Sequence, residues 1–210
     1  MTASQTILKN FEHEVVLLNN MLKQDHILLA KDLSEFQLFI TKTMAEQGDF
    51  VNVANRIFVA KDYASNDFLI RQLLLEQGLY YGQTALYLWE LSDTFPYKIQ
   101  MAFRPGYHLP KRNYLEWTQN IIVKQVREPL LSTNIEQLSL AGTRKKIHLY
   151  SPERTLVDIV RRRNEFDQET INQAYKRYLH SPKRHLNKLL AVAKQTNGEK
   201  QVRNIVKILL

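Results

Sequence analysis

The sequence predicts an α+β protein in two parts: an N-terminal winged helix-turn-helix (residues 1–62) followed by a mixed α/β domain (residues 63–210) with a helical C-terminal end. Within the first 60 residues, apolar spacings typical of helices give way to two short β-like runs. Later in the chain, β-like runs alternate with helical ones and are followed by successive amphipathic helices. The 44% apolar and 24% charged content is typical of a globular protein.

Three helices are predicted before the first β-like run. Residues 4–22 repeat apolar side chains at the i, i+3, i+4 spacing of an amphipathic helix, and Ile27–Leu33 is long enough for two helical turns. A third helix is expected to begin at Ser34, which with Gln37 fits the capping-box pattern. Gly48 is suited to ending this helix.

A β-hairpin is predicted directly after the third helix. Phe50–Val53 and Ile57–Val59 form two short strands, and Asn55 between them tolerates the positive φ that such a turn needs. Three helices followed by a hairpin is the order of a winged helix-turn-helix, in which the last helix enters the major groove of DNA. The alternative is a small helical cap whose hairpin binds nothing.

The second part is expected to begin after a linker at residues 61–66 and to mix helices with strands. A Ser-Pro pair at residues 151–152 is a strong helix start, because proline suits the first helical turn. The predicted helices lie at residues 68–77, 84–91, 152–162, 167–179, 182–195 and 199–210. The predicted strands lie at residues 98–103, 120–126 and 145–150, with a turn at Pro105-Gly106 between the first two.

The sequence contains no pattern of residues that indicates catalysis. The absence of cysteine excludes disulfides, thiolate metal sites and a cysteine nucleophile. The six histidines show no metal-ligand spacing, and no glycine-rich phosphate loop is present. We therefore expect a protein that is not an enzyme and needs no metal or cofactor. No apolar run is long enough for a signal peptide or a membrane span, which predicts a soluble, cytoplasmic protein.

The net charge of +8 is unevenly distributed and favours a polyanionic partner such as DNA or RNA. Residues 1–62 contain six basic and eight acidic residues, whereas residues 63–210 contain 23 basic and 13 acidic ones. The predicted DNA-binding head is therefore net acidic. It must concentrate its few cations on one face, or the second domain must supply the attraction to phosphate.

Two stretches of the sequence resemble the AbiEi-type antitoxins of abortive-infection toxin–antitoxin systems. The segments Ile27–Leu33 and Ile40–Val59 are similar to the winged-helix head of that family, with its pattern met at Met44, Gly48, Phe50, Val53 and Phe58. More specific are YYGQTALYLWELSD (residues 80–93) and YSPERTLVDIVRR (residues 150–162), which resemble the two signatures of the antitoxin domain. Where the family often has glycine in the wing, this chain has Arg56.

The resemblance implies a negative autoregulator of a two-gene operon and an antitoxin. The head would bind inverted repeats in the operator, which implies two protomers per site. The functional partner would be a nucleotidyltransferase-like toxin, neutralised in this family without a stable complex. Operator DNA would then be the direct partner, with no role for a membrane.

Six residues of the head are the candidates for contact with DNA. Glutamine pairs bidentately with adenine, threonine contacts phosphate or a thymine methyl group, and lysine or arginine neutralises phosphate. The alternative is an ordinary solvated helix face. The candidates are Lys31, Gln37, Thr41, Lys42, Asn55 and Arg56.

Three basic groups in the second part are candidates for a surface that attracts nucleic acid. Most charge runs are solvated faces, and a cluster at a helix end also suits the negative end of the helix dipole. The groups are Arg144, Lys145 and Lys146; Arg161, Arg162 and Arg163; and Lys176, Arg177, Lys183, Arg184 and Lys188.

Within PERTLVD, Arg154 and Asp158 stand four residues apart and are expected to pair on one helix face. We interpret the motif as a structural junction between strand and helix. The rival function for the whole chain is an interaction module that does not bind DNA. In that case the basic domain would bind an acidic protein or RNA, an alternative that the acidic head favours.

Overall fold

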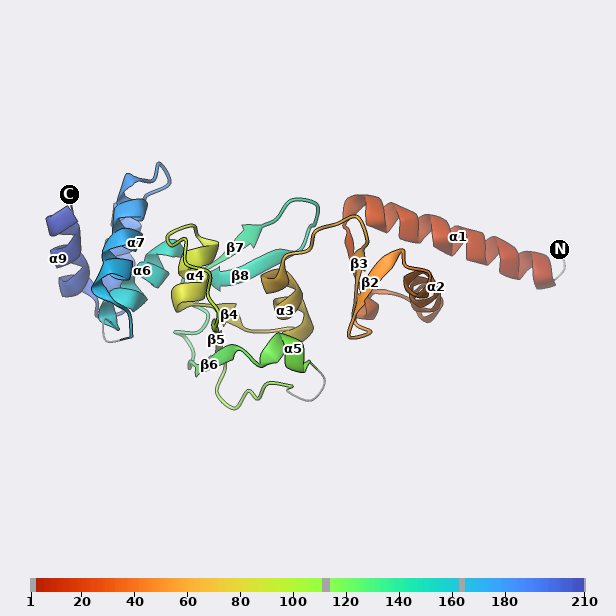
Figure 1. The fold of residues 1–210 in the computed structure, drawn as a ribbon, viewed down its shortest axis with the longest axis horizontal. Coiled ribbons are helices and arrows are strands. Elements are labelled where there is room, and N and C mark those ends of the chain that lie inside the picture. The colour runs from red at the N-terminus through yellow and green to blue at the C-terminus, as the bar shows by residue number, and fades with distance from the viewer. Residues whose placement is uncertain (1–2, 111–113, 163–164, 210) are drawn as a thin grey trace. The chain divides into compact units, whose positions relative to one another are not determined.

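The computed structural model describes residues 3–110, 114–162 and 165–209 of the chain (Figure 1). It confirms the α+β class, because helices and two β-sheets both contribute. The chain divides into two compact units, and neither is continuous in sequence. Unit 1 consists of Met1–Glu76, Pro110–Leu115 and Leu138–Ile147; unit 2 consists of Gln77–Leu109, Glu116–Gln137 and His148–Leu210. The sequence placed a single boundary after residue 62, and the structure differs from that division.

Unit 1 is built on a three-stranded antiparallel sheet with the strand order β1-β3-β2. The core against this sheet joins Leu18, Ile40 and Phe58, and the predicted first helix, third helix and hairpin are confirmed. The elements are α1 (Ala3–Gln24), β1 (Ile27–Leu29), the 3-10 turn η1 (Ala30–Asp32), α2 (Glu35–Glu46), β2 (Phe50–Val53), β3 (Ile57–Ala60) and α3 (Asp67–Leu75).

The prediction of a two-turn helix at Ile27–Leu33 is wrong. Its first three residues form β1, which pairs with β3 in the register Ile27 to Val59, and only one 3-10 turn follows. Ile27 and Leu28 are both buried. A short apolar run suits either a helix or a strand, and here an edge of the β3 strand was available to pair with it.

A late segment of the chain completes unit 1. The backbone N–H of His26 donates to the carbonyl of Gly142 (3.3 Å), and the His26 ring nitrogen Nδ1 lies 2.6 Å from the same oxygen. The ring of Tyr63 stacks on His26, with centroids 5.0 Å apart. Lys145 Nζ lies 2.7 Å from the carboxylate of Asp25. Residues 138–147 are therefore anchored where α1 passes into β1, about 120 positions earlier in the sequence.

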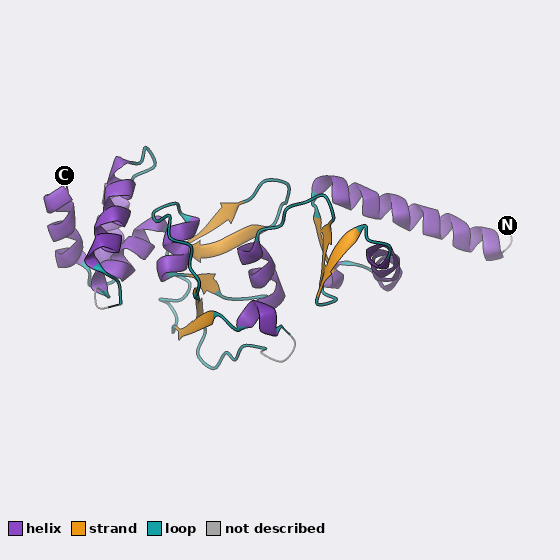
Figure 2. Ribbon diagram, viewed as in Figure 1, coloured by secondary structure: helices purple, strands orange, loops and turns teal. Residues whose placement is uncertain are grey.

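The second sheet has the strand order β6-β5-β4-β8-β7 (Figure 2). Strands β4 and β5 are antiparallel, whereas β4 pairs with β8, and β5 with β6, in parallel. The chain turns at Pro105-Gly106, but this turn is only part of the connection from β5 to β6. Because these two strands are parallel, they need a longer crossover. The strands are β4 (Leu79–Tyr80), β5 (Ile99–Phe103), β6 (Ile121–Gln125), β7 (Ile135–Ser139) and β8 (Lys146–Tyr150).

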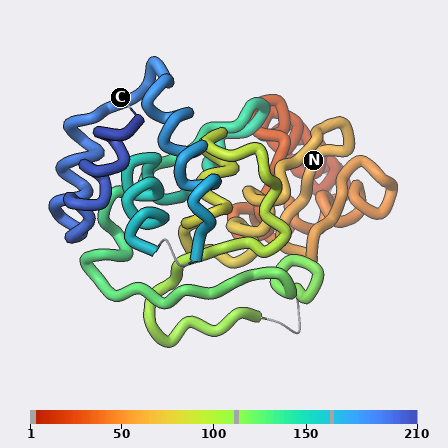
Figure 3. The backbone as a smooth tube through the Cα atoms, turned by 60° about the vertical axis from the view of Figure 1, so that its left-hand side comes forward, coloured from red at the N-terminus to blue at the C-terminus, as the bar shows by residue number. Residues whose placement is uncertain are grey.

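The C-terminal helices of unit 2 form one cluster, with α6 in contact with α4, α7, α8 and α9 (Figure 3). Its core includes Leu156, Ile159, Tyr175 and Leu189, all buried. The helices of the cluster are α4 (Gly82–Leu88), α6 (Pro152–Arg161), α7 (Gln168–His180), α8 (Leu186–Gln195) and α9 (Glu199–Leu209), and the short helix α5 (Leu115–Thr118) precedes β6 in the sequence. Among the described residues, none of the helices combines the length and the apolar character that crossing a membrane requires.

We predict that Gly142→Ala destabilises unit 1 more than Gly106→Ala destabilises unit 2. Both glycines have positive φ (74° and 80°), but a Cβ at Gly142 would lie 2.7 Å from the Tyr63 ring, whereas one at Gly106 meets nothing within 4 Å. The backbone term of about 1 kcal/mol should be common to both variants, and the clash should add about 1–2 kcal/mol at Gly142. Urea unfolding of each variant measures the difference, and equal destabilisation would contradict the anchoring role of this turn.

Candidate nucleic-acid interface

Helix α2, the candidate for reading DNA, begins with the capping box that the sequence predicts. Ser34 Oγ accepts a hydrogen bond from the backbone N–H of Gln37, and Gln37 Oε1 accepts one from the backbone N–H of Ser34, both at 3.1 Å. The Gln37 amide also donates to Glu14 on α1 (2.7 Å). Gln37 is therefore bonded within unit 1, and its predicted pairing with adenine would require it to break these contacts.

The predicted exposure of Thr41 is wrong. Its side chain is completely buried, and its Oγ1 donates to the carbonyl of Gln37 at 2.8 Å. Thr41 lies beside Ile40 on the face of α2 that packs inward, which is why it cannot contact DNA. Lys42 is exposed, as predicted, and its neighbours on the outer face are Phe39, 63% exposed, and Thr43.

The turn between β2 and β3 places polar groups at its tip. Ala54 and Asn55 both have positive φ (54° and 56°), which confirms the conformation expected of Asn55. The side chain of Asn52 bonds both the backbone N–H of Asn55 (3.0 Å) and its side-chain oxygen (2.8 Å). Arg56 is exposed, and its carbonyl accepts from the N–H of Ala30 (2.8 Å). The turn is thus held by the Asn52 side chain and by the backbone of Ala30.

Lys31 lies beside this turn but is already paired. Its Nζ is 3.3 Å from the carboxylate of Glu76, and both side chains are about half exposed. Together with Arg56 they line one small pocket of unit 1. An exposed pair of this kind contributes little to stability, so Lys31 is easily released to a phosphate.

The basic groups predicted for the second part divide into exposed and paired residues. Arg163 lies outside the described residues. Those engaged in ion pairs are Lys145 with Asp25, Arg162 with Glu165, Arg177 with Asp93, and Lys188 with Glu136 and Glu153. Those exposed at the surface are Arg144, Lys146, Arg161, Lys176, Lys183 and Arg184.

The assignment of residues 138–147 to unit 1 changes the charge balance of the unit that contains the acidic head. Arg144, Lys145 and Lys146 belong to the same compact unit as the acidic head. The described residues of unit 1 include ten basic and ten acidic ones, whereas residues 1–62 alone contain six and eight. Over its described residues, the unit that carries α2 and the β2–β3 turn is therefore no longer net acidic.

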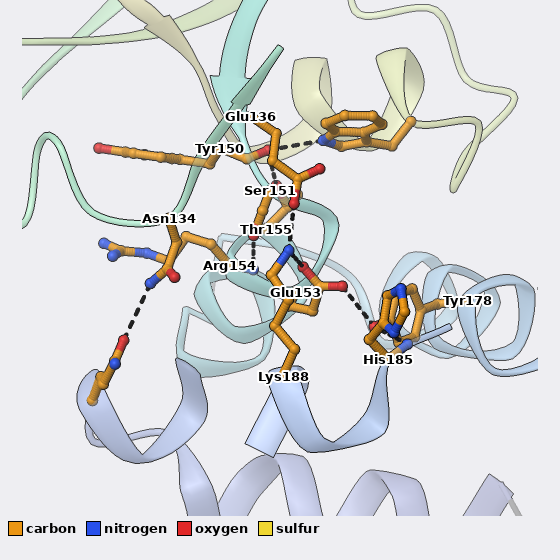
Figure 4. Close-up of polar contacts among 12 residues, drawn as sticks. Asn134, Glu136, Tyr150, Ser151, Glu153, Arg154, Thr155, Tyr178, His185 and Lys188 are labelled. Carbon is orange, nitrogen blue, oxygen red and sulfur yellow. Dashed lines mark hydrogen bonds and ion pairs between the residues drawn. The ribbon is translucent and has the colours of Figure 1, made fainter. Parts of the chain in front are cut away.

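The charged residues at the start of α6 serve a buried network in unit 2 rather than a surface. Glu153 is almost completely buried, with Oε1 accepting from the hydroxyl of Tyr178 (2.8 Å) and Oε2 lying 2.9 Å from Lys188 Nζ (Figure 4). The Tyr178 hydroxyl in turn accepts from the backbone N–H of His185 (2.9 Å). Burial alone would raise the pKa of Glu153, but the hydrogen bonds from Lys188, the backbone and Tyr178 outweigh it and lower the pKa.

The predicted pairing of Arg154 with Asp158 is confirmed. Arg154 Nε donates to Asp158 at 3.1 Å, and both side chains are buried. Ser151 caps α6 by accepting from the backbone N–H of Arg154 (3.2 Å), with Pro152 in the first turn. The polar residues of PERTLVD therefore hold the junction of β8 and α6. Among the residues that the structure covers, His, Asp and Glu form no group of three placed to hold a metal ion.

No family model matches the chain. A comparison with curated proteins also finds no match. Among solved structures, the chain is similar to the RV2827C protein from Mycobacterium tuberculosis, with a TM-score of 0.54 and 13% sequence identity over 94% of this chain and 81% of that one. At this identity the likeness shows a shared fold.

Sequence reasoning missed three side chains that the structure brings to notice. Phe39 and Thr43 occupy the outer face of α2, where the sequence placed Gln37 and Thr41. Lys124 lies in β6 with its Nζ over a tyrosine ring of the same unit. A lysine within the apolar run NIIVKQV was the available signal for the last of these.

We predict that Glu153→Gln lowers the free energy of unfolding by about 1–3 kcal/mol at pH 7, because neutral hydrogen bonds replace charge-assisted ones. The folded-state pKa of Glu153 lies below its unfolded value, so the native stabilisation is present above pH of about 4.3 and is lost as pH falls through the folded pKa. Urea unfolding between pH 3 and 7 should show the difference between native protein and variant shrinking toward acid. A difference independent of pH would contradict the ionised state of Glu153.

Proposed function

We propose that this chain is a DNA-binding transcriptional regulator that contacts its operator through unit 1. The observation that carries the proposal is the order helix, strand, turn, helix and hairpin on a β1-β3-β2 sheet, which leaves the outer face of α2 and the β2–β3 turn exposed. In this interpretation, η1 stands where a winged helix-turn-helix has its second helix, and α2 is the recognition helix. With 12 residues, α2 is about 18 Å long and fits the major groove.

The contacts follow from which side chains α2 and the turn expose. Lys42 and Arg56 would neutralise phosphates, and Asn55 would bond the backbone at the wing. Phe39 and Thr43 replace Gln37 and Thr41 as the groups that face base edges, since a phenyl ring or a threonine methyl packs on the methyl group of thymine. Arg144 and Lys146 supply further positive charge to the same unit.

We further propose that the operator belongs to a toxin–antitoxin operon and that the chain is its antitoxin, which represses its own promoter. The support is the resemblance of TALYLWEL and PERTLVD to the signatures of AbiEi-type antitoxins. A neighbouring gene for a nucleotidyltransferase-like toxin is the expected genetic context. Co-expression of both genes tests this second part separately from DNA binding.

The second candidate is an interaction module that does not bind DNA, and exposed apolar residues favour it. Phe36 packs edge to face on Phe11 of α1 (6.0 Å), and Phe39 beside it is largely uncovered. The N-terminal half of α1 extends past α2 and exposes Ile7 and Leu8 (Figure 1). A contiguous apolar patch on these two helices suits a protein partner.

The two candidates differ in the binding expected on the chain's own upstream promoter. For the regulator, fluorescence anisotropy should show affinity at least about 10³-fold above that for a scrambled duplex. Lys42→Ala with Arg56→Ala should lower that affinity roughly 50-fold near 0.1 M salt and reduce the slope of log affinity against log salt by about 1.8, because two phosphate contacts are lost.

The matched control is Lys9→Ala with Lys23→Ala, which removes two exposed lysines of α1 in the same unit. It should leave both affinity and slope nearly unchanged. An equal loss in both double variants would show general electrostatic attraction only. No binding of the native protein to either duplex would favour the interaction module.

A further inference from the structure

Two buried hydrogen-bond donors at the start of α6 have no partner. The hydroxyl of Tyr150 and the Nη1 atom of Arg154 are enclosed in unit 2, and neither meets an acceptor among the described residues. Both side chains are more than nine-tenths buried. In Figure 4 they extend to the same side, away from Glu153, and the guanidinium carbon of Arg154 lies 5.0 Å from the centre of the Tyr150 ring. Leaving a buried donor unpaired costs about 1–3 kcal/mol, so two together point to a missing acceptor.

Strand pairing places the amine of Lys124 on the same face of the second sheet as Tyr81 and Tyr150. Tyr80 pairs with Leu149, so Tyr81 and Tyr150 follow side by side at the ends of β4 and β8. Lys124 on β6 is opposite Ala102 on β5, and its Nζ lies 4.6 Å from the centre of the Tyr81 ring. Ala102 itself is fully buried, in one cluster with Tyr81 and Tyr150.

The described charged residues around Lys124 do not supply a carboxylate to pair with its ammonium group. Asp158 is paired with Arg154, and Glu165 lies 3.4 Å from Arg162, whereas Lys124 has no ion pair within the described ranges. Burial lowers the pKa of Lys124 to about 8; the two carboxylates oppose this shift, and the two guanidinium groups add to it. Three cations thus face two carboxylates.

We infer that Lys124, Tyr150 and Arg154 form a binding site for a phosphate-type oxyanion, taken either as the free ion or as the terminal group of a small phosphate ester. An oxyanion has several acceptor atoms and a negative charge, which match two unpaired donors and one unpaired amine. A cation would meet an excess of positive charge, and a single buried water would satisfy the donors but leave Lys124 unmatched. The site is separate from the proposed DNA contacts of unit 1 and does not depend on them.

Calorimetric titration of the whole chain with inorganic phosphate, and with sulfate at matched ionic strength, tests this inference. We expect one saturable site per chain for each ion. A nucleoside 5′-monophosphate added in a second series identifies the source, because tighter binding than phosphate indicates an ester and equal binding indicates the free ion. No saturable binding of any of the three would overturn the proposal and leave the donors to a buried water.

Two variants each remove a single polar group of the site. Tyr150→Phe deletes only the unpaired hydroxyl and should leave the unliganded protein at least as stable, because no hydrogen bond is lost. Lys124→Met keeps the aliphatic stem. Each should lower the affinity for sulfate at least tenfold, whereas Lys98→Met, which removes an exposed lysine of the same unit, should not. Equal affinities in all three variants would overturn the assignment.

The pH dependence gives a readout specific to Lys124. Sulfate remains a dianion between pH 7 and 9.5, so any change in its affinity reports on the protein. Since Lys124 loses its proton with a pKa of about 8, the affinity should fall roughly tenfold over this range. The other charged side chains that face Lys124 are Arg154, Asp158, Arg162 and Glu165, and the phenol of Tyr81 lies beside it. In Lys124→Met the dependence should vanish, and its persistence would contradict the role of this amine.

Discussion

Helix α6 is enclosed by α4, α7, α8 and α9, and every residue from Glu153 to Val160 is buried. Three of those residues are charged, and a buried charge is tolerated only when its neighbours supply hydrogen bonds and opposite charge. Glu153 therefore requires Tyr178 from α7 and Lys188 from α8. The C-terminal helices are thus fixed by more than apolar contact, because their positions must also bring these polar atoms to α6.

Local rules in the sequence anticipated most of the helices and the hairpin. The capping box of α2 and the proline start of α6 depend on residues within one turn of each other, so they are visible without knowledge of the fold. Strands β4 and β7 were missed, and β1 was taken for a helix, because a strand of two to five residues is decided by the partner it pairs with. That partner lies far away in the sequence.

The candidate interface was anticipated only in part for a related reason. The sequence shows which positions of α2 are polar, but tertiary packing decides which of them face outward. Thr41 is buried at little expense because its hydroxyl bonds the carbonyl of Gln37 in the same helix, while Phe39 remains outside. Lys124, Tyr150 and Arg154 come from separate strands and a helix, and no spacing rule connects them.

The anchoring of residues 138–147 at the α1–β1 junction has a consequence for biosynthesis. As the ribosome delivers the chain from its N-terminus, the first 76 residues emerge long before Gly142 and Lys145, which provide the carbonyl that His26 binds and the ammonium group that faces Asp25. Unit 1 therefore cannot form all of its contacts until roughly two thirds of the protein has been translated. A product that terminates before these residues, or an isolated N-terminal fragment, would lack the closing contacts, so the completion of unit 1 depends on synthesis through residue 147.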